Sequence, residues 1–273
     1  MAADVALSER FREQCLADES IPDDQREFAC GPPASEQGFS EEFYLDSQPF
    51  QLAADLPAGA IAVAVATAAG AFVIGATAIG AEWSTRVIVT LLSWEPRRLR
   101  VLGVKTAVVA LLLTVVAVVA QLAWLGMGQV LARTRGSTDV PEDFWVDFLG
   151  QGGRSVLFAV LLGLLGFGLA NLIRNTGAAL GIGFVYFAVL ETAVRAFRPT
   201  GQPFLISDSA AALLLDGGHR IFISGPAVDT ETGAFTEYSE VLLSNLRGGL
   251  TLTAYSLVLL AVGAWLFRRR DLH

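Results

Sequence analysis

Long apolar segments alternate with short polar ones over most of the chain. Five of these segments contain almost no charged side chains, and each is bounded by arginine, lysine or acidic residues. A helix needs about 20 mostly apolar residues to cross roughly 30 Å of hydrocarbon. The pattern therefore predicts an all-α integral membrane protein with five transmembrane helices. The predicted spans are 56–81, 106–132, 155–173, 176–197 and 250–267.

Composition agrees with this class. The chain is 53% hydrophobic and 17% charged, whereas soluble domains carry about 25% charged residues. Glycine is frequent within the spans, for example at Gly163, Gly166 and Gly168. Small residues let helix backbones approach closely in lipid. We therefore interpret these glycines as helix-packing positions, and not as a phosphate-binding loop.

The first 55 residues differ from the rest. They hold 13 acidic residues and three arginines. We predict two units, an acidic extracytoplasmic segment over 1–55 and a transmembrane domain over 56–273. Both cysteines, Cys15 and Cys30, lie in the acidic segment. Outside the cytoplasm a disulfide between them is favoured, and two unpaired thiols are the alternative.

The basic residues indicate an orientation. They gather in the loop 82–105, beside Arg174 and in the tail after residue 267. Five spans place these three segments on one side, and short cytoplasmic loops are rich in lysine and arginine. We therefore predict a multi-pass protein of the cell membrane with a cytoplasmic C-terminus. The N-terminus and the loops 133–154 and 198–249 then lie outside.

This orientation raises a question about translocation. The first residues show neither the basic region nor the apolar region of a signal peptide. The acidic segment must nevertheless cross the membrane. We expect a further span upstream, so that the native start precedes Met1. Insertion of the N-terminus driven by the first span is the alternative.

Residues for chemistry are scarce. The chain has two histidines and two cysteines, and it lacks the HExxH, CxxC, P-loop and GxSxG patterns. The sequence therefore predicts no metal site, no cofactor, no catalytic residue and no nucleic-acid partner. A serine–histidine pair using His219 is disfavoured, because a single loop histidine is more often a solvated residue.

Burying a charged or amide side chain inside a span costs free energy, so each such residue calls for an explanation. Glu191 and Arg195 are spaced to share a helix face near the end of the fourth span. We favour an ion pair at the membrane interface with Arg195 snorkelling, and a polar element lining a pathway is the alternative. Gln121, Asn171 and Asn175 are expected to hydrogen-bond across helices.

The loop between the first two spans is the most informative stretch. Over 82–105 an amphipathic element carries Trp83 and Trp94 and breaks at Pro96. The basic group that follows suits anionic headgroups. This stretch is either a lipid-surface anchor or a docking surface for a cytoplasmic protein. The basic group expected to anchor the next span is Arg97, Arg98 and Arg100.

The order of residues in this loop resembles a known family. The first span ends in Gly-Ala-Glu-Trp, and Thr-Leu-Leu, Pro-Arg-Arg and a lysine opening the next span follow. This order resembles the permease subunits of ABC-2 type transporters. Specific similarity covers 80–105, and similarity of topology covers 56–270. That family has six spans, so the resemblance implies that the first helix is lacking. It also implies a short helix over 207–215.

The resemblance further implies a function. The segment after the first span would couple to a separate ABC ATPase subunit, and a second permease copy or a related permease would complete the pathway. The chain would then be the transport subunit of an ATP-driven exporter and perform no chemistry itself. A non-transporting membrane scaffold, or an immunity or sensor protein, is the alternative. The implied coupling residues are Glu82, Trp83, Arg86, Thr90 and Leu91. The residues that the resemblance implies as anchors of this segment are Arg97, Arg98 and Lys105.

Overall fold

The structure is a computed structural model that describes residues 2–17, 22, 29–30, 49–85, 87, 97–228 and 235–269. Five helices are long and apolar enough to cross a membrane, which confirms the predicted multi-pass helical protein. The helices are α1 (Ala2–Leu16), α4 (Leu52–Ser84), α6 (Arg98–Arg135), α7 (Phe144–Ile173), α8 (Thr176–Val185), the π-helical turn η1 (Tyr186–Leu190), α9 (Glu191–Phe197), the 3-10 helix η2 (Pro199–Phe204), α10 (Ile206–Leu214) and α11 (Asn245–Arg269). The strands are β1 (Phe50–Gln51), β2 (Gly136–Ser137), β3 (His219–Val228) and β4 (Phe235–Leu243).

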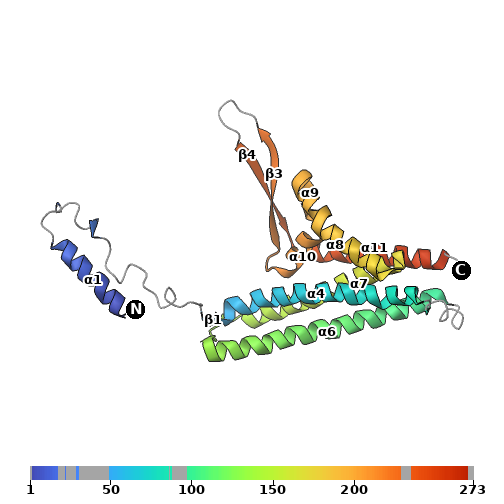
Figure 1. Ribbon diagram of the computed structural model, residues 1–273, viewed down its shortest axis with the longest axis horizontal. Coiled ribbons are helices and arrows are strands. Elements are labelled where there is room, and N and C mark those ends of the chain that lie inside the picture. The colour runs from blue at the N-terminus through green and yellow to red at the C-terminus, as the bar shows by residue number, and fades with distance from the viewer. Residues whose placement is uncertain are drawn as a thin grey trace.

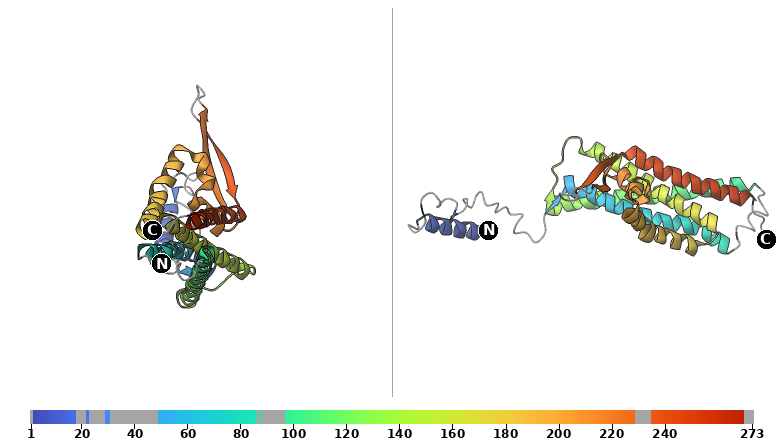
Figure 2. Two further views of the ribbon diagram at one scale, coloured as in Figure 1. Left: turned by 90° about the vertical axis from the view of Figure 1, so that its right-hand side faces the viewer. Right: turned by 90° about the horizontal axis from the view of Figure 1, so that it is seen from above.

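Four helices run side by side along the long axis of the bundle. These are α4, α6, α7 and α11, while α9 and the β3–β4 hairpin turn away from the axis on one side (Figures 1 and 2). We call the end at which α4 begins and the hairpin lies the hairpin end. We call the opposite end, at which α4 and α11 finish, the C-terminal end. The run α8–η1–α9 forms the fourth span.

Helix α7 lies at the centre of the bundle. It packs against α4, α6 and α11, and the most apolar stretch of α7 is 61% buried, against 17% for that of α6. A Cβ added to Gly75 of α4 would lie 1.9 Å from the carbonyl oxygen of Gly163 of α7. The two backbones therefore touch, as the glycine pattern predicted. The buried small residues of α4 include Ala60, Ala64, Ala68, Ala71, Gly75 and Ala76.

Helix α7 begins well before the predicted start at residue 155. Its added turns carry Phe144 and Phe148, which pack with Leu56 of α4 in a small core at the hairpin end. Gln151 is buried and donates a hydrogen bond to the carbonyl of Pro57, with a nitrogen–oxygen distance of 3.1 Å. Hydropathy excluded these turns because they mix polar and apolar residues, although tertiary packing stabilises them.

The segment predicted as the loop 198–249 is largely ordered structure. The implied short helix is present as α10, but β3 and β4 form an antiparallel hairpin that the sequence analysis did not predict. Ile221 and Leu243 of the hairpin pack against Ala212 of α10. A second, two-residue pairing joins β1 and β2 in parallel. Strand pairing of this kind depends on contacts outside the spans, which hydropathy does not report.

Candidate functional site

An ion pair joins the ends of α4 and α6 at the C-terminal end. Lys105 Nζ donates a hydrogen bond to Glu82 Oε1, and both side chains are about one-quarter exposed. Glu82 lies at the beginning of the loop 82–105 and Lys105 at its end, so the ion pair holds the two ends of this loop together. Glu82 Oε2 is buried and has no hydrogen-bond partner in the part of the chain that the structure describes. A buried oxygen without a partner costs free energy.

Trp83 connects α4 to two further helices. Its indole N–H donates to Asn171 Oδ1 of α7 at 3.3 Å, and the Phe267 ring of α11 meets it edge-on with centroids 5.7 Å apart. The guanidinium of Arg174 lies over the indole, 4.2 Å from the ring centroid. Stacking of this kind contributes about 0.5–1 kcal/mol at a partly exposed site. We call Glu82, Trp83, Lys105, Asn171, Arg174 and Phe267 the Trp83 cluster.

The turn between α7 and α8 positions Arg174. Arg174 ends α7 in the left-handed conformation, with φ 62°, and its N–H donates to the carbonyl of Ala170. Asn175 then caps α8, since its Oδ1 accepts from the N–H of Ala178 at 2.9 Å. Asn175 therefore caps its own helix instead of bonding across helices. Asn171 and Gln121 do bond across helices, and Gln121 donates to the carbonyl of Ala60 at 3.2 Å.

Only part of the predicted coupling segment lies within the described residues. Glu82 and Trp83 end α4, whereas the three remaining predicted positions lie outside the described residues. Of the predicted anchors, Arg97 is exposed immediately before α6, Arg98 is the first residue of that helix, and Lys105 forms an ion pair with Glu82. The predicted positions outside the description are Arg86, Thr90 and Leu91.

A second polar cluster lies at the hairpin end, around Glu191. Glu191 follows the π-helical turn η1 and is 5% exposed. Its carboxylate accepts hydrogen bonds from the N–H of Ser207, at 3.1 Å, and from the Ser207 hydroxyl. Tyr186 Oη accepts from the N–H of Ile206 at 3.2 Å. Two groups of the fourth span therefore satisfy the otherwise unpaired amides at the start of α10.

Arg195 extends this cluster to α10. Its nearest nitrogen lies 3.9 Å from Glu191 Oε2, in the spacing that the sequence predicted, and 3.0 Å from Asp208 Oδ2. His219 Nε2 of β3 lies 3.6 Å from Asp208 Oδ1. Sequence reasoning did not select Asp208 or Ser207. A serine followed by an aspartate just before an apolar run is a helix-start signal, which could have marked the start of α10 but not its partner.

These contacts tie elements together and hold no recognisable reaction centre. Among the residues that the structure describes, no serine hydroxyl bonds to His219, and no group of three or more His, Cys, Asp or Glu side chains is placed to hold a metal ion. Cys15 and Cys30 are joined by a disulfide, with their Cα atoms 5.6 Å apart. The two clusters thus fix the two ends of the bundle, and the Trp83 cluster lies where the predicted coupling segment leaves α4.

Comparison with known proteins adds no family to this picture. The chain matches no family model, no curated protein and no solved structure.

Proposed function

We propose that this chain is a membrane-spanning permease subunit of an ATP-driven transporter of the ABC-2 type, and that it works as an exporter with a separate ATPase subunit. A second permease copy or a related permease completes the pathway. The resemblance over 80–105 motivates the proposal. The geometry of the Trp83 cluster supports it, because a push on the end of α4 there reaches three other helices through direct contacts.

The Glu82–Lys105 pair is the observation that carries the proposal. A segment that transmits force needs a stiff attachment, and this pair joins both of its ends at a partly buried site. Trp83 then links the same point to α7 and α11. Closure of the ATPase subunits displaces this attachment, and the spans exchange between conformations that differ in stability with nucleotide bound.

The orientation belongs to the same proposal, with the C-terminal end in the cytoplasm. In the described part of that end, Glu82 is the one acid among several arginines, which agrees with the excess of basic residues in cytoplasmic loops. Single cysteines test it in a chain whose own cysteines are paired. A membrane-impermeant maleimide should label Ser137→Cys in intact cells, and Leu99→Cys only after permeabilisation. The reverse pattern rejects the orientation.

The coupling proposal is tested by co-expression with an ATPase encoded beside this chain. We expect the ATPase to copurify in detergent and its ATP hydrolysis to rise when the complex is placed in nanodiscs. Glu82→Lys should lower that stimulation severalfold, because it sets two cations against each other. The double exchange of Glu82→Lys with Lys105→Glu should restore most of it.

The Arg154–Asp216 pair at the hairpin end is the matched control. Asp216→Lys breaks an ion pair of similar exposure on the arginine side and should leave the stimulation unchanged. Failure of an ATPase to copurify, or equal losses from both ion pairs, rejects coupling. The first of these outcomes favours the alternative, a non-transporting scaffold or an immunity or sensor protein.

A further inference from the structure

Two apolar crevices flank the fourth span. One lies between α8–η1 and α11 and has a volume of about 610 Å³; the other lies between α8–η1 and α4 and has a volume of about 680 Å³. Both are within the range of roughly 300–1,000 Å³ that small-molecule sites occupy. The two crevices meet at Gly183, where a Cβ would lie 2.8 Å from the Phe72 ring. We call them the α11 crevice and the α4 crevice.

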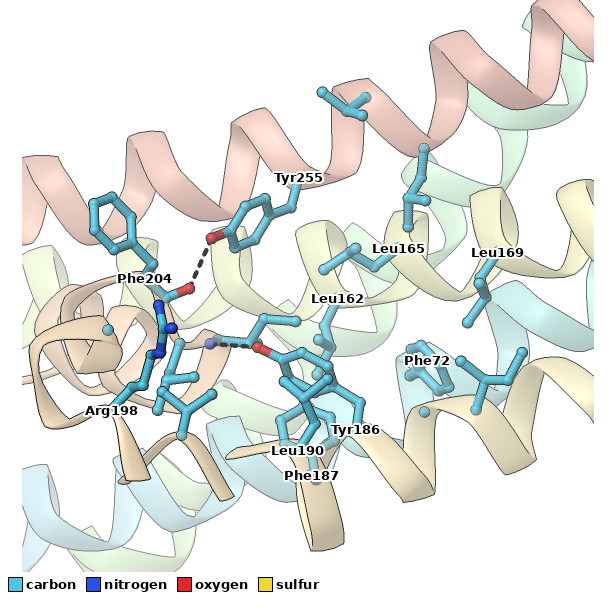
Figure 3. A pocket seen from close by; sticks show the side chains of 18 residues that line it. Phe72, Leu162, Leu165, Leu169, Tyr186, Phe187, Leu190, Arg198, Phe204 and Tyr255 are labelled. Atoms are coloured by element: carbon cyan, nitrogen blue, oxygen red, sulfur yellow. Dashed lines mark hydrogen bonds between the residues drawn. The ribbon is translucent and has the colours of Figure 1, made fainter. Parts of the chain in front are cut away.

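The α11 crevice has a cation at one end. Among the described residues that line it, Arg198 is the charged one, and the rest of the wall is almost entirely apolar. Figure 3 shows Arg198 and Phe204 at one end of the crevice, with Leu162 and Leu165 further in and Leu169 beyond them. The α4 crevice has no charged residue among its described lining residues. The two crevices therefore differ in charge, although their volumes are similar.

A second cation lies at the same end of the α11 crevice. The guanidinium of Arg247 lies 5.9 Å from the centroid of the Phe204 ring, and Arg198 immediately follows the fourth span. Neither arginine forms an ion pair with a carboxylate in the part of the chain that the structure describes. Other arginines at the hairpin end do, such as Arg154, Arg195 and Arg220. Arg198 and Arg247 are thus two cations with a free charge at one rim.

Both arginines lie at the ends of candidate spans, Arg198 just after the fourth span and Arg247 at the start of α11, which is where a bilayer has its headgroups. Arg247 lies in the first turn of α11, and Tyr255 lies about 12 Å further along the helix at 1.5 Å per residue. Tyr255 Oη donates to the carbonyl of Phe204 at 2.7 Å, and Tyr186 Oη is bonded to Ile206 (Figure 3). These bonds use polar groups inside the crevice. What remains for a ligand is an apolar channel below a cationic rim.

We propose that the α11 crevice is a binding site for one acyl chain of an anionic phospholipid, in the leaflet at the hairpin end, with the phosphate at Arg198 and Arg247. Arginine side chains pair with phosphate groups through charge-assisted hydrogen bonds, and the apolar wall takes the chain. Lipid binding at this site does not require an ATPase, so the experiment below tests it independently of the coupling proposal.

The test uses the full chain in nanodiscs with two photoreactive lipids. Phosphatidylglycerol and phosphatidylcholine each carry the same diazirine-bearing acyl chain, and mass spectrometry maps the crosslinks. We expect phosphatidylglycerol to label 255–259 of the α11 crevice in preference to phosphatidylcholine. The preference should reach about fivefold, the upper end for one exposed ion pair. Labelling of 61–73 in the α4 crevice should not distinguish the two lipids.

Matched variants separate a site from ordinary lipid contact. Arg198→Gln should remove most of the preference, Arg198→Lys should keep it, and Arg135→Gln, at an exposed arginine of α6, should leave it unchanged. Val258→Trp fills the α11 crevice and should abolish its labelling by both lipids, whereas Val65→Trp fills the α4 crevice and should not. The two valines are 58% and 51% exposed, so both variants are tolerated. Equal labelling by the two lipids, or no effect of Arg198→Gln or Val258→Trp, overturns the proposal.

Discussion

Helix α4 contacts two neighbours in different ways. Against α7 it packs through small residues along most of its length, and Gly75 brings its backbone onto that of Gly163. Against the fourth span its close approaches are those of Gly80 to Thr176, at the start of α8, and of Phe72 to Gly183, and a crevice opens on either side of the second. The first interface runs along most of α4, and the second is much smaller.

The difference shows where each contact takes its stability. Close packing of small residues gives α4 and α7 many weak dispersion contacts in lipid, where no hydrophobic driving force joins helices. The fourth span has fewer such contacts with α4 and takes more of its stability from polar contacts at its ends, where Glu191 and Arg195 hold α10 and the turn at Arg174 joins it to α7. Substitutions at the two interfaces should therefore differ in size and in what they loosen.

The largest expected effect is at the α4–α7 contact. Gly75→Ala places a Cβ 1.9 Å from the carbonyl oxygen of Gly163, so the helices must separate, at a cost of about 3 kcal/mol in the free energy of unfolding. Gly70→Ala is the control, since nothing lies within 4 Å of its added Cβ. Unfolding in mixed micelles with sodium dodecyl sulfate measures both. Equal stability of the two variants contradicts close packing.

A smaller effect is expected at the attachment of the fourth span. Glu191→Ala removes the acceptor of the Ser207 amide and hydroxyl and one partner of Arg195. The loss is about 2 kcal/mol, as for hydrogen bonds to a charged group. Hydrogen exchange of the amides in 206–209 should accelerate, while α4 amides stay protected. Thr192→Ala is the control, because its hydroxyl donates to the carbonyl of Ala188 within the fourth span. Unchanged exchange in the Glu191 variant rejects the capping role.

The Trp83 cluster should respond less. Trp83→Phe removes the hydrogen bond to Asn171 and weakens the stacking of Arg174, but it keeps an aromatic ring against Phe267. We expect a loss of about 1 kcal/mol in the free energy of unfolding. Trp265→Phe is matched to it, since that indole is 48% exposed and contacts Arg269 of its own helix. A larger loss of unfolding free energy from Trp265→Phe than from Trp83→Phe contradicts a stabilising role for the contacts of Trp83.

The smallest effect is expected at His219. His219→Gln leaves Asp208 paired with Arg195, and the histidine side chain is 30% exposed. The change in the free energy of unfolding should be at most about 0.5 kcal/mol, as for a partly exposed pair. Arg195→Gln serves as the reference and should cost more, because Arg195 bonds both Asp208 and Ser207. A reversed order shows that the histidine is the main partner of Asp208.

Sequence reasoning reached the candidate site unevenly. Glu82, Trp83 and Lys105 were chosen from a resemblance and lie together at one point. The spacing of Glu191 and Arg195 indicated a shared helix face, but their contacts with Ser207 and Asp208 were missed. Spacing within a helix reports which residues share a face. It does not report which distant element covers that face.

The sequence by itself determined the membrane class, the five spans and the acidic and basic character of its segments. These properties are local, because about 20 apolar residues in a row suffice to specify a span whatever surrounds them. Only the tertiary structure decided that α7 is central, that Trp83 contacts Asn171 and Phe267, and that a β-hairpin follows α10. Those features join residues far apart in the chain, and in lipid their energies depend on close packing and on satisfied polar groups, which no linear pattern records.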